Sequence, residues 1–590
     1  MLASPWEWRW PDGGCSPGLV GGISALNPGA MTEAITSIPL ADYFQPLERG
    51  RNPESIYVGV MLLILAAGTM LVRRGGNPIT IALTLTGLLG VSITLDGINQ
   101  LFNQLPMHHL LWPLRFLGVA SFMLLLALLW RVQGWRHAYP LFVLPALLLL
   151  GLDNAGSLQL VHLREPRQNI IGASHSLARS TGWRVATLDL SRWGSTPTYL
   201  FSSLGGREQV FGWAYQGAST ARTVAALNEA IEMGDINYLI DRLDLLGVDD
   251  VAIHPDLPNG KAIAQSLAAG GFQQTYSSAE LSLYHRDGGP RALAVDRTAI
   301  GIGNGAQNLA YLFPQIILGT SAKIDEYDLR DLTKYRLLVL SGFTWRDREK
   351  AEDLVKEVMA AGVRVVIDLT GVQEDPVARI PRFLGVWGER IILAKESIRI
   401  SGSNKTYALR PFEGEDELWY TITPQNLSGE TLSMNYLGEE TSVLGYIEQQ
   451  GYKAWFLGLN LPYLARLNHD PTAIDLLAEV LQLEPGRRQD YRSIPLTDYQ
   501  ADQDGYRFEY QMDAPETLLV PLAYHDGAYV TIDGLEGRLQ SFEHLVAFEA
   551  PAGEHTVEVR LAPSRYHMSG WGICGLSLAI LLFSHVRRKR

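Results

Sequence analysis

The chain has 590 residues, of which 47% are hydrophobic and 19% are charged, and its formal net charge is −13. A nucleic-acid partner needs a basic face, so this charge argues against one. The two cysteines, Cys15 and Cys574, lie far apart in the sequence. That spacing disfavours a disulfide framework, a cysteine metal site and a thiol catalytic pair.

Five apolar runs predict membrane spans. A helix needs about 20 mostly apolar residues to cross a bilayer, and the last two runs are short. Flanking Trp and Tyr residues would extend them, and the alternative for a short run is a buried core helix. The runs are Ile56–Val72, Ile79–Leu95, Leu110–Trp130, Ala138–Leu152 and Trp571–Val586.

Basic residues between the apolar runs predict the orientation. Arg73, Arg136 and the tail 587–590 fall on one side of a five-span threading. Because cytoplasmic segments carry the excess of Lys and Arg, this side is expected to be cytoplasmic. Residues 1–55 and 153–568 are then expected outside, although no signal peptide opens the chain. Either the first segment is translocated unaided or the chain lacks upstream spans.

Alternating strand and helix patterns predict an exterior α/β region. Residues 183–190 are strand-like, and Thr220–Leu245 has the apolar period of one long helix. Two continuous apolar strands, 336–340 and 363–369, flank an amphipathic helix at 347–361. This βαβ pattern predicts a parallel sheet.

Short strands broken by Asp-Gly and Pro-Ala-Gly turns predict a β-sandwich near the end of the chain. The predicted fold class is therefore a membrane α-helical bundle of five spans, with extracytoplasmic α/β domains, one of them flavodoxin/amidotransferase-like, and a carboxy-terminal β-sandwich. The predicted domains are an exterior segment 1–55, a four-span membrane domain 56–152, a mixed α/β domain 153–290, a doubly wound amidotransferase-like domain 291–490, a β-sandwich 491–568, and a terminal span with a basic tail 569–590.

Sequence motifs for catalysis and cofactors are weak. Gly301, Gly303 and Gly305 follow a strand, but their G-x-G-x-G spacing differs from the dinucleotide fingerprint and favours a tight turn. Ser341 stands at the turn where an amidotransferase carries its cysteine nucleophile, but it lacks a G-x-S-x-G frame. The histidines show no metal-ligand spacing. We therefore expect neither a cofactor nor a metal.

One loop is a candidate sugar-binding site. Gly212–Gly217 places Trp213 and Tyr215 among glycines, with Gln216 beside them. Aromatic rings stack on sugar rings, and Gln216 and Glu208 would hydrogen-bond sugar hydroxyls. The alternative is a packed aromatic turn.

Arg115 lies close to the start of the third apolar run. An arginine within a membrane span is a functional-site hypothesis by default. The alternative is that its guanidinium extends to the outer interface a few residues away.

Several segments resemble a known family. Residues 529–534 and 551–559, followed by Gly570 and a final apolar run, resemble the carboxy-terminal end of YfhO-like bacterial membrane proteins. Residues 113–116 and the 212–217 loop resemble the related group labelled 6-pyruvoyl-tetrahydropterin synthase-related membrane proteins. The sequence has no pterin-synthase histidine cluster, so that label does not describe an activity here.

The resemblance implies a multi-pass protein of the bacterial inner membrane that is GT-C glycosyltransferase-like and acts in envelope polysaccharide or glycolipid biogenesis. Its implied partners are the lipid bilayer and a polyprenyl-phosphate sugar or an envelope glycan. Arg115 would pair with the lipid phosphate. Asp42 is an exterior carboxylate, but it does not match the position of the family's catalytic base. The alternative function is a non-catalytic membrane-anchored exterior module that binds glycan or a partner protein.

Overall fold

The computed structural model describes residues 78–93, 95, 98, 113–133, 168–190, 192–193, 196–210, 221–375, 378–402, 405–414, 418–449, 451–501, 505–524, 527–561, 570, 572 and 575–576. The chain divides into two compact units. The first unit comprises Met1–Cys15 and Gly21–Pro166, and the second comprises Ser16–Val20 and Arg167–Arg590.

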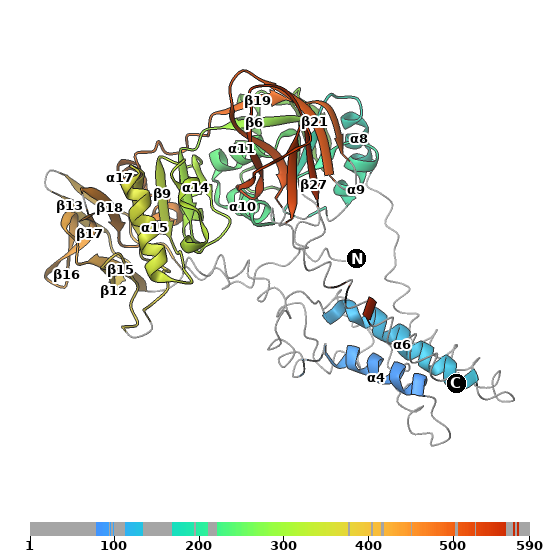
Figure 1. Ribbon diagram of the computed structural model, residues 1–590, viewed down its shortest axis with the longest axis horizontal. Helices are drawn as coiled ribbons and strands as arrows, with labels where there is room; N and C mark the ends of the chain where they lie inside the picture. The colour runs from blue at the N-terminus through green and yellow to red at the C-terminus, as the bar shows by residue number, and fades with distance from the viewer. Residues whose placement is uncertain are drawn as a thin grey trace. The chain divides into compact units, whose positions relative to one another are not determined.

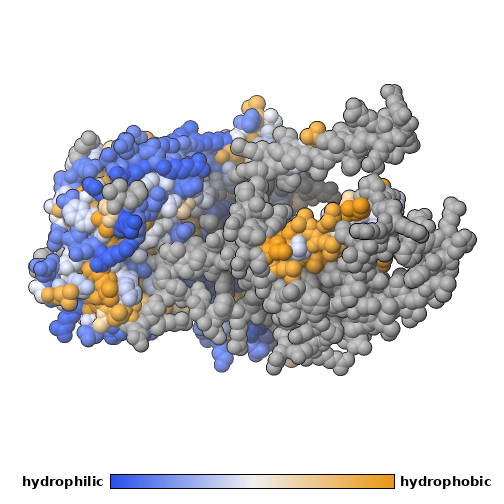
Figure 2. Space-filling model, turned by 90° about the horizontal axis from the view of Figure 1, so that it is seen from below, coloured by the Kyte–Doolittle hydropathy of each residue, from blue (hydrophilic) through white to orange (hydrophobic). Residues whose placement is uncertain are grey.

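Two packed helices make up the described part of the first unit. They are α4 (Pro78–Ser92) and α6 (Pro113–Gln133). Gly87 allows the close approach, because a Cβ there would lie 2.6 Å from Leu124 Cγ. Large apolar side chains such as Leu85 and Phe122 are exposed, and Figure 2 shows hydrophobic residues gathered on the surface of this helix pair.

The predicted five-span membrane bundle is wrong. Within the described ranges, no helix combines the length and the apolar character that crossing a bilayer requires. An apolar run in a sequence indicates hydrophobicity, but it does not give the length of continuous helix. Helix α4 ends at Ser92, whereas the apolar run that predicted it continues to Leu95. The runs at 56–72 and 138–152 lie outside the described residues, as does most of 571–586. What the structure describes beyond α4 and α6 is α/β and β-rich.

A five-stranded mixed sheet opens the second unit, in the order β2-β1-β3-β5-β4. Strands β1, β2 and β3 are parallel, and β5 runs antiparallel to both β3 and β4. The strands are β1 (Arg184–Leu188), β2 (Glu208–Gln209), β3 (Val248–Ile253), β4 (Gln273–Ser277) and β5 (Ser282–His285). The helices are α8 (Gln168–Leu177), α9 (Thr196–Ser203), α10 (Ala221–Met233), α11 (Ile236–Leu245) and α12 (Gly260–Ala269).

The single long helix predicted over Thr220–Leu245 is two helices, α10 and α11. Gly234 ends α10 with φ +84°, the left-handed conformation that glycine adopts without a Cβ penalty. The apolar period continues across this break, so periodicity alone could not reveal it.

A nine-stranded sheet forms the second α/β domain, in the order β14-β13-β16-β17-β18-β10-β9-β7-β8. Its strands are β7 (Ala299–Ile302), β8 (Ile316–Leu318), β9 (Leu337–Ser341), β10 (Arg364–Asp368), β13 (Ile398–Gly402), β14 (Thr406–Leu409), β16 (Gly429–Tyr436), β17 (Glu439–Gln449) and β18 (Tyr452–Leu457). Its helices are α13 (Ala306–Leu312), η3 (Ile324–Glu326), α14 (Leu329–Leu332), α15 (Arg348–Ala360), α16 (Leu461–Leu467) and α17 (Pro471–Leu481).

The predicted βαβ unit is confirmed by β9, α15 and β10. The two strands pair in parallel, and Figure 1 shows α15 beside β9. Asp347 begins α15, because its carboxylate accepts hydrogen bonds from the backbone N–H groups of Glu349 and Lys350. Alternate residues of β9 enter two different cores, so apolar residues cover both faces of the sheet, as in a doubly wound fold.

Three further sheets complete the second unit. A small one has the order β11-β12-β15, and two five-stranded sheets have the orders β19-β6-β22-β26-β25 and β20-β21-β27-β23-β24. The last two share one apolar core and form a β-sandwich. The strands are β6 (Arg291–Val295), β11 (Arg382–Phe383), β12 (Val386–Ala394), β15 (Leu418–Gln425), β19 (Tyr491–Pro495), β20 (Thr497–Ala501), β21 (Gly505–Met512), β22 (Glu516–Ala523), β23 (Ala528–Ile532), β24 (Leu535–Gly537), β25 (Leu539–Phe542), β26 (Leu545–Ala550) and β27 (Gly553–Leu561).

Strand β6 enters the β-sandwich from far earlier in the chain. It pairs antiparallel with both β19 and β22, and Figure 1 shows it beside β19. Arg291 lies opposite Pro495, and Val295 lies opposite Tyr491. In this antiparallel pair the segment before β6 lies next to the end of β19, where the N–H of Leu496 donates to Pro290 O at 3.0 Å.

Candidate functional site

Most of the predicted binding residues lie outside the described residues. These are Asp42, Trp213, Tyr215 and Gln216. The backbone of Arg115 belongs to the first turn of α6. A role for these five residues stays a prediction.

Glu208 is described, and both of its carboxylate oxygens accept hydrogen bonds from the protein. Arg184 Nη2 donates to Oε2 at 2.8 Å, and the Tyr499 hydroxyl donates to Oε1 at 2.7 Å. Arg184 belongs to β1 and Tyr499 to β20, so Glu208 joins the first sheet to the β-sandwich. A sugar hydroxyl would have to share these oxygens with existing partners.

Ser341, the candidate nucleophile, ends β9, and its side chain is not accessible to solvent. Its side chain is buried and donates a 3.0 Å hydrogen bond to Asp368 Oδ2 at the end of β10. Burial raises the pKa of Asp368 to about 6, although the N–H and hydroxyl of Thr370 lower it. A nucleophile must be accessible to its substrate. Ser341 is only 1% exposed, so a substrate could not reach its hydroxyl.

The glycine motif after β7 makes a contact between two loops. Gly303 has φ +102°, and a Cβ there would lie 2.3 Å from Ser341 O. The N–H of Asn304 donates to Gly342 O at 3.1 Å, and the N–H of Gly305 donates to Ser341 O at 2.9 Å. This geometry supports the predicted tight turn, because backbone of the neighbouring loop fills the space above the glycines.

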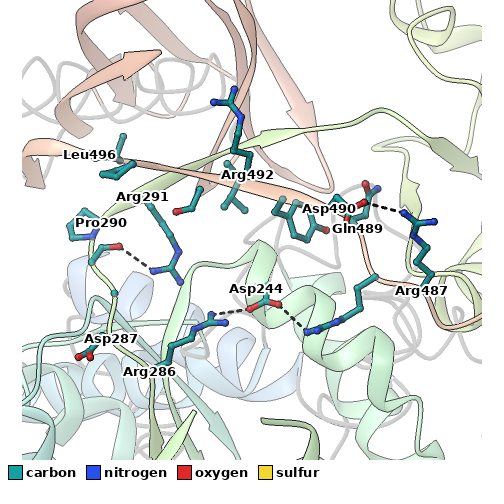
Figure 3. A pocket seen from close by; sticks show the side chains of 17 residues that line it. Asp244, Arg286, Asp287, Pro290, Arg291, Arg487, Gln489, Asp490, Arg492 and Leu496 are labelled. Atoms are coloured by element: carbon teal, nitrogen blue, oxygen red, sulfur yellow. Dashed lines mark hydrogen bonds and ion pairs between the residues drawn. The ribbon is translucent and has the colours of Figure 1, made fainter. Parts of the chain in front are cut away.

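A charged groove is the strongest candidate site in the described residues. It has a volume of about 1240 Å³ and lies between the segment that leads into β6 and the segment that leads into β19 (Figure 3). We call it the arginine groove. Its charged lining residues are Arg286, Arg291, Arg487, Arg488, Arg492, Asp244, Asp287 and Asp490.

Ion pairs between buried or half-buried side chains stabilise the inner part of the arginine groove. Asp244, at the end of α11, accepts from Arg286 Nη2 at 2.9 Å and from Arg488 Nη1 at 3.3 Å, so it lies between two guanidinium groups (Figure 3). Arg291 forms an ion pair with Asp249, which is fully buried on β3 and also accepts from the N–H of Trp183. These contacts fix the floor of the groove.

The outer part of the groove carries two arginines that face solvent. The side chains of Arg487 and Arg488 are 53% and 43% exposed, and Arg487 pairs with Asp490 at 3.2 Å. Arg492 extends from β19 away from the other groove arginines and pairs with Glu516 at 2.6 Å (Figure 3). Exposed ion pairs contribute little to stability, so a ligand can replace their carboxylates at small cost.

Sequence reasoning missed this groove. The adjacent pair Arg487 and Arg488 was a visible local signal, but Arg286 and Arg291 lie about 200 residues earlier. The antiparallel pairing of β6 with β19 and the carboxylate of Asp244, which accepts from both Arg286 and Arg488, bring these arginines into one groove. In the described part of the chain, no cluster of His, Cys, Asp and Glu side chains has the arrangement of a metal site.

Three family models match successive parts of the chain. Residues 15–160 match the model described as "6-pyruvoyl-tetrahydropterin synthase related domain; membrane protein". Residues 168–297 and 298–464 match two models that are each described as a domain of unknown function, DUF8559 and DUF8560. No curated protein matches the sequence significantly.

Two solved structures resemble this chain weakly. α-L-Fucosidase isoenzyme 2 from Paenibacillus thiaminolyticus is 11% identical, with a TM-score of 0.22, over 46% of this chain and 49% of that enzyme. β-Galactosidase from Bacillus circulans sp. alkalophilus is 11% identical, with a TM-score of 0.20, over 45% of this chain and 42% of that enzyme. The matched part spans about half of each enzyme or less, and these scores carry no argument about fold or activity.

The membrane-protein match is the one that bears on identity. It covers residues 15–160, which include both helices described in the first unit. It supports a membrane location for the chain. At this coarse level, the amino-terminal part of the chain is similar to the 6-pyruvoyl-tetrahydropterin synthase-related, YfhO-like membrane proteins.

Proposed function

We propose that this chain is a membrane protein of envelope polysaccharide or glycolipid biogenesis whose second unit binds glycan without performing chemistry on it. The arginine groove is the observation that carries this proposal. It is an open groove of about 1240 Å³ with guanidinium and carboxylate groups on its walls. Guanidinium groups donate hydrogen bonds and carboxylates accept them, and sugar hydroxyls need both.

The closed state of Ser341 supports a binding role over a catalytic one. The side chain of this candidate nucleophile is buried, and its hydroxyl donates to Asp368. The weak match to glycoside hydrolases adds nothing to this choice.

Glycan binding is tested with the full chain in lipid nanodiscs and a panel of acidic and neutral oligosaccharides. Ser493 lines the groove and is exposed on β19, so Ser493→Trp is expected to fill the groove and weaken binding at least tenfold. Ser401→Trp places the same side chain at an exposed site on β13 and is the matched control. Absence of glycan binding by the unaltered chain would refute the proposal.

The family resemblance and the membrane-protein match favour a second candidate, a polyprenyl-phosphate-dependent GT-C-like glycosyltransferase whose chemistry takes place in the first unit. Arg115 would pair with the lipid phosphate and Asp42 would line the site. The assay is transfer of a labelled sugar from polyprenyl phosphate by the full chain, comparing Arg115→Ala and Asp42→Asn with the parent. If the parent transfers no sugar, this candidate is removed.

We also propose that the second unit lies on the extracytoplasmic side of the inner membrane, as the resemblance implies. A cysteine at Leu535, which is 75% exposed at a hairpin of the β-sandwich, would report this. With Cys15 and Cys574 replaced by serine, Leu535→Cys is expected to react with a membrane-impermeant maleimide in intact cells. Labelling only after permeabilisation would place the second unit in the cytoplasm.

A further inference from the structure

We propose that the arginine groove selects acidic glycans, in which sugar carboxylates bind Arg487 and Arg488. This inference rests on the proposed glycan-binding function and deepens it by naming the class of glycan. Five arginines and three aspartates line the groove, although acidic residues outnumber basic ones, 62 to 49, in the whole chain. The groove therefore concentrates guanidinium groups on an acidic protein.

Arg488 is only partly neutralised. Asp244 is shared between Arg488 and Arg286, so one carboxylate balances two guanidinium groups. Arg286 is further held by the carbonyl oxygen of Val248 and by the ring of Phe272, 4.4 Å from its guanidinium carbon. Arg488 is the more exposed member and is available to a second carboxylate. A guanidinium fork binds carboxylates in a bidentate manner.

Arg487 shows the geometry that a ligand carboxylate would adopt. Its Nη2 lies 3.2 Å from Asp490 Oδ2, and both side chains are exposed by more than half. A sugar carboxylate can take the place of Asp490 without moving any buried group. The aspartate carboxylates that pair with these arginines thus occupy the positions that we propose for the carboxylates of the ligand.

The shape of the groove favours a glycan chain over a single small anion or a membrane surface. Its volume is about 1240 Å³, whereas small-ligand pockets are about 300–1000 Å³. Apolar residues Pro290, Leu293 and Pro495 also line it and offer surface to the faces of sugar rings. The arginines come from two segments, residues 286–291 and 487–492, so a ligand lies between them (Figure 3).

The test compares four probes against the full chain in nanodiscs of neutral lipid. They are oligogalacturonate, a neutral maltooligosaccharide of the same length, inorganic phosphate, and vesicles that contain anionic lipid. We expect oligogalacturonate to bind at least about tenfold more tightly than the neutral oligomer, with an affinity that falls as salt rises. Arg487→Gln and Arg488→Gln should each weaken that binding about tenfold.

Arg399→Gln is the matched control, because Arg399 is an exposed arginine on β13 outside the groove. Unchanged thermal unfolding of the groove variants would show that they fold. Equal affinity for acidic and neutral oligomers would overturn the inference while leaving glycan binding intact. Failure of every oligosaccharide to bind would instead remove the proposed function. Binding of phosphate or vesicles as tightly as oligogalacturonate would overturn the assignment to a glycan.

Discussion

The second unit uses arginine in two different ways, in its interior and in the arginine groove. Arg242 is fully buried, and its guanidinium contacts Asp241, Glu543 and the carbonyl oxygens of Pro314 and Ile316. Arg487, at the outer part of the groove, is about half exposed, and its ion-pair partner Asp490 is exposed as well. A buried charge whose hydrogen-bond and ion-pair partners all come from the protein has a structural role. A surface charge with few protein partners can still bind a ligand.

The buried arginines connect parts of the second unit that are distant in sequence. Arg242 joins α11 to the β-sandwich through Glu543. Arg466 joins α16 to α10 and to the residue before α11, because it pairs with Glu229 and with Asp235 at 2.9 Å. Its guanidinium carbon also lies 3.5 Å from the centre of the Tyr311 ring. These contacts fix the relative positions of the α/β elements and the β-sandwich.

The largest expected effect is that of Arg242→Ala. Removing this arginine leaves the carboxylates of Asp241 and Glu543 buried without their partner, which costs about 3–5 kcal/mol of unfolding free energy. Chemical denaturation of the full chain in detergent measures this loss. A loss below about 1 kcal/mol would contradict the structural role, since an exposed ion pair contributes that little.

The pH dependence of stability is the next largest effect. Burial raises the pKa of Asp368 from 3.8 to about 6, so the folded state binds a proton that the unfolded state releases between these values. Stability should therefore fall as pH rises from about 4 to about 6, by about 3 kcal/mol for this group. Asp368→Asn should remove this share of the pH dependence.

The control for that pH profile is Asp353→Asn, on the exposed side of α15. It should leave the slope between pH 4 and 6 unchanged. Burial also raises the pKa of Asp241 to about 6, so part of the slope should persist in Asp368→Asn. A profile that is identical in Asp368→Asn and the parent would show that Asp368 does not bind this proton.

The smallest expected effect on stability is that of Arg487→Ala. Its ion pair with Asp490 is exposed, so the loss should stay below about 1 kcal/mol of unfolding free energy. The same variant should still weaken binding of an acidic oligosaccharide, measured by titration calorimetry. A large loss of stability would give Arg487 a structural role and remove its contrast with Arg242.

Local structure was predictable where the signal lies within one segment. The helix at Arg348–Ala360 follows from its apolar period and from Asp347 at its start. The strands on either side of it were continuous apolar runs, which is typical of a parallel sheet covered on both faces. The break between α10 and α11 was missed, because Gly234 interrupts the backbone without interrupting the apolar period.

The membrane bundle and the site were less predictable, for different reasons. Apolar runs predicted five spans, but among the described residues no helix meets the requirements for crossing a bilayer. The site candidates chosen from local composition lie mostly outside the described residues, and Glu208 is occupied by Arg184 and Tyr499. The groove was invisible because its two arginine segments are distant in sequence.

The sequence by itself determined many of the helices and strands of the second unit, its α/β and β-rich character, and the resemblance of the chain to a family of membrane proteins. Periodicity, caps and turns act over a few residues, so one segment contains the whole signal. Only the tertiary structure decided that β6 joins the β-sandwich, that Ser341 is closed off and that five arginines line one groove. These features depend on contacts between segments distant in the chain, and local sequence does not specify which segments will meet.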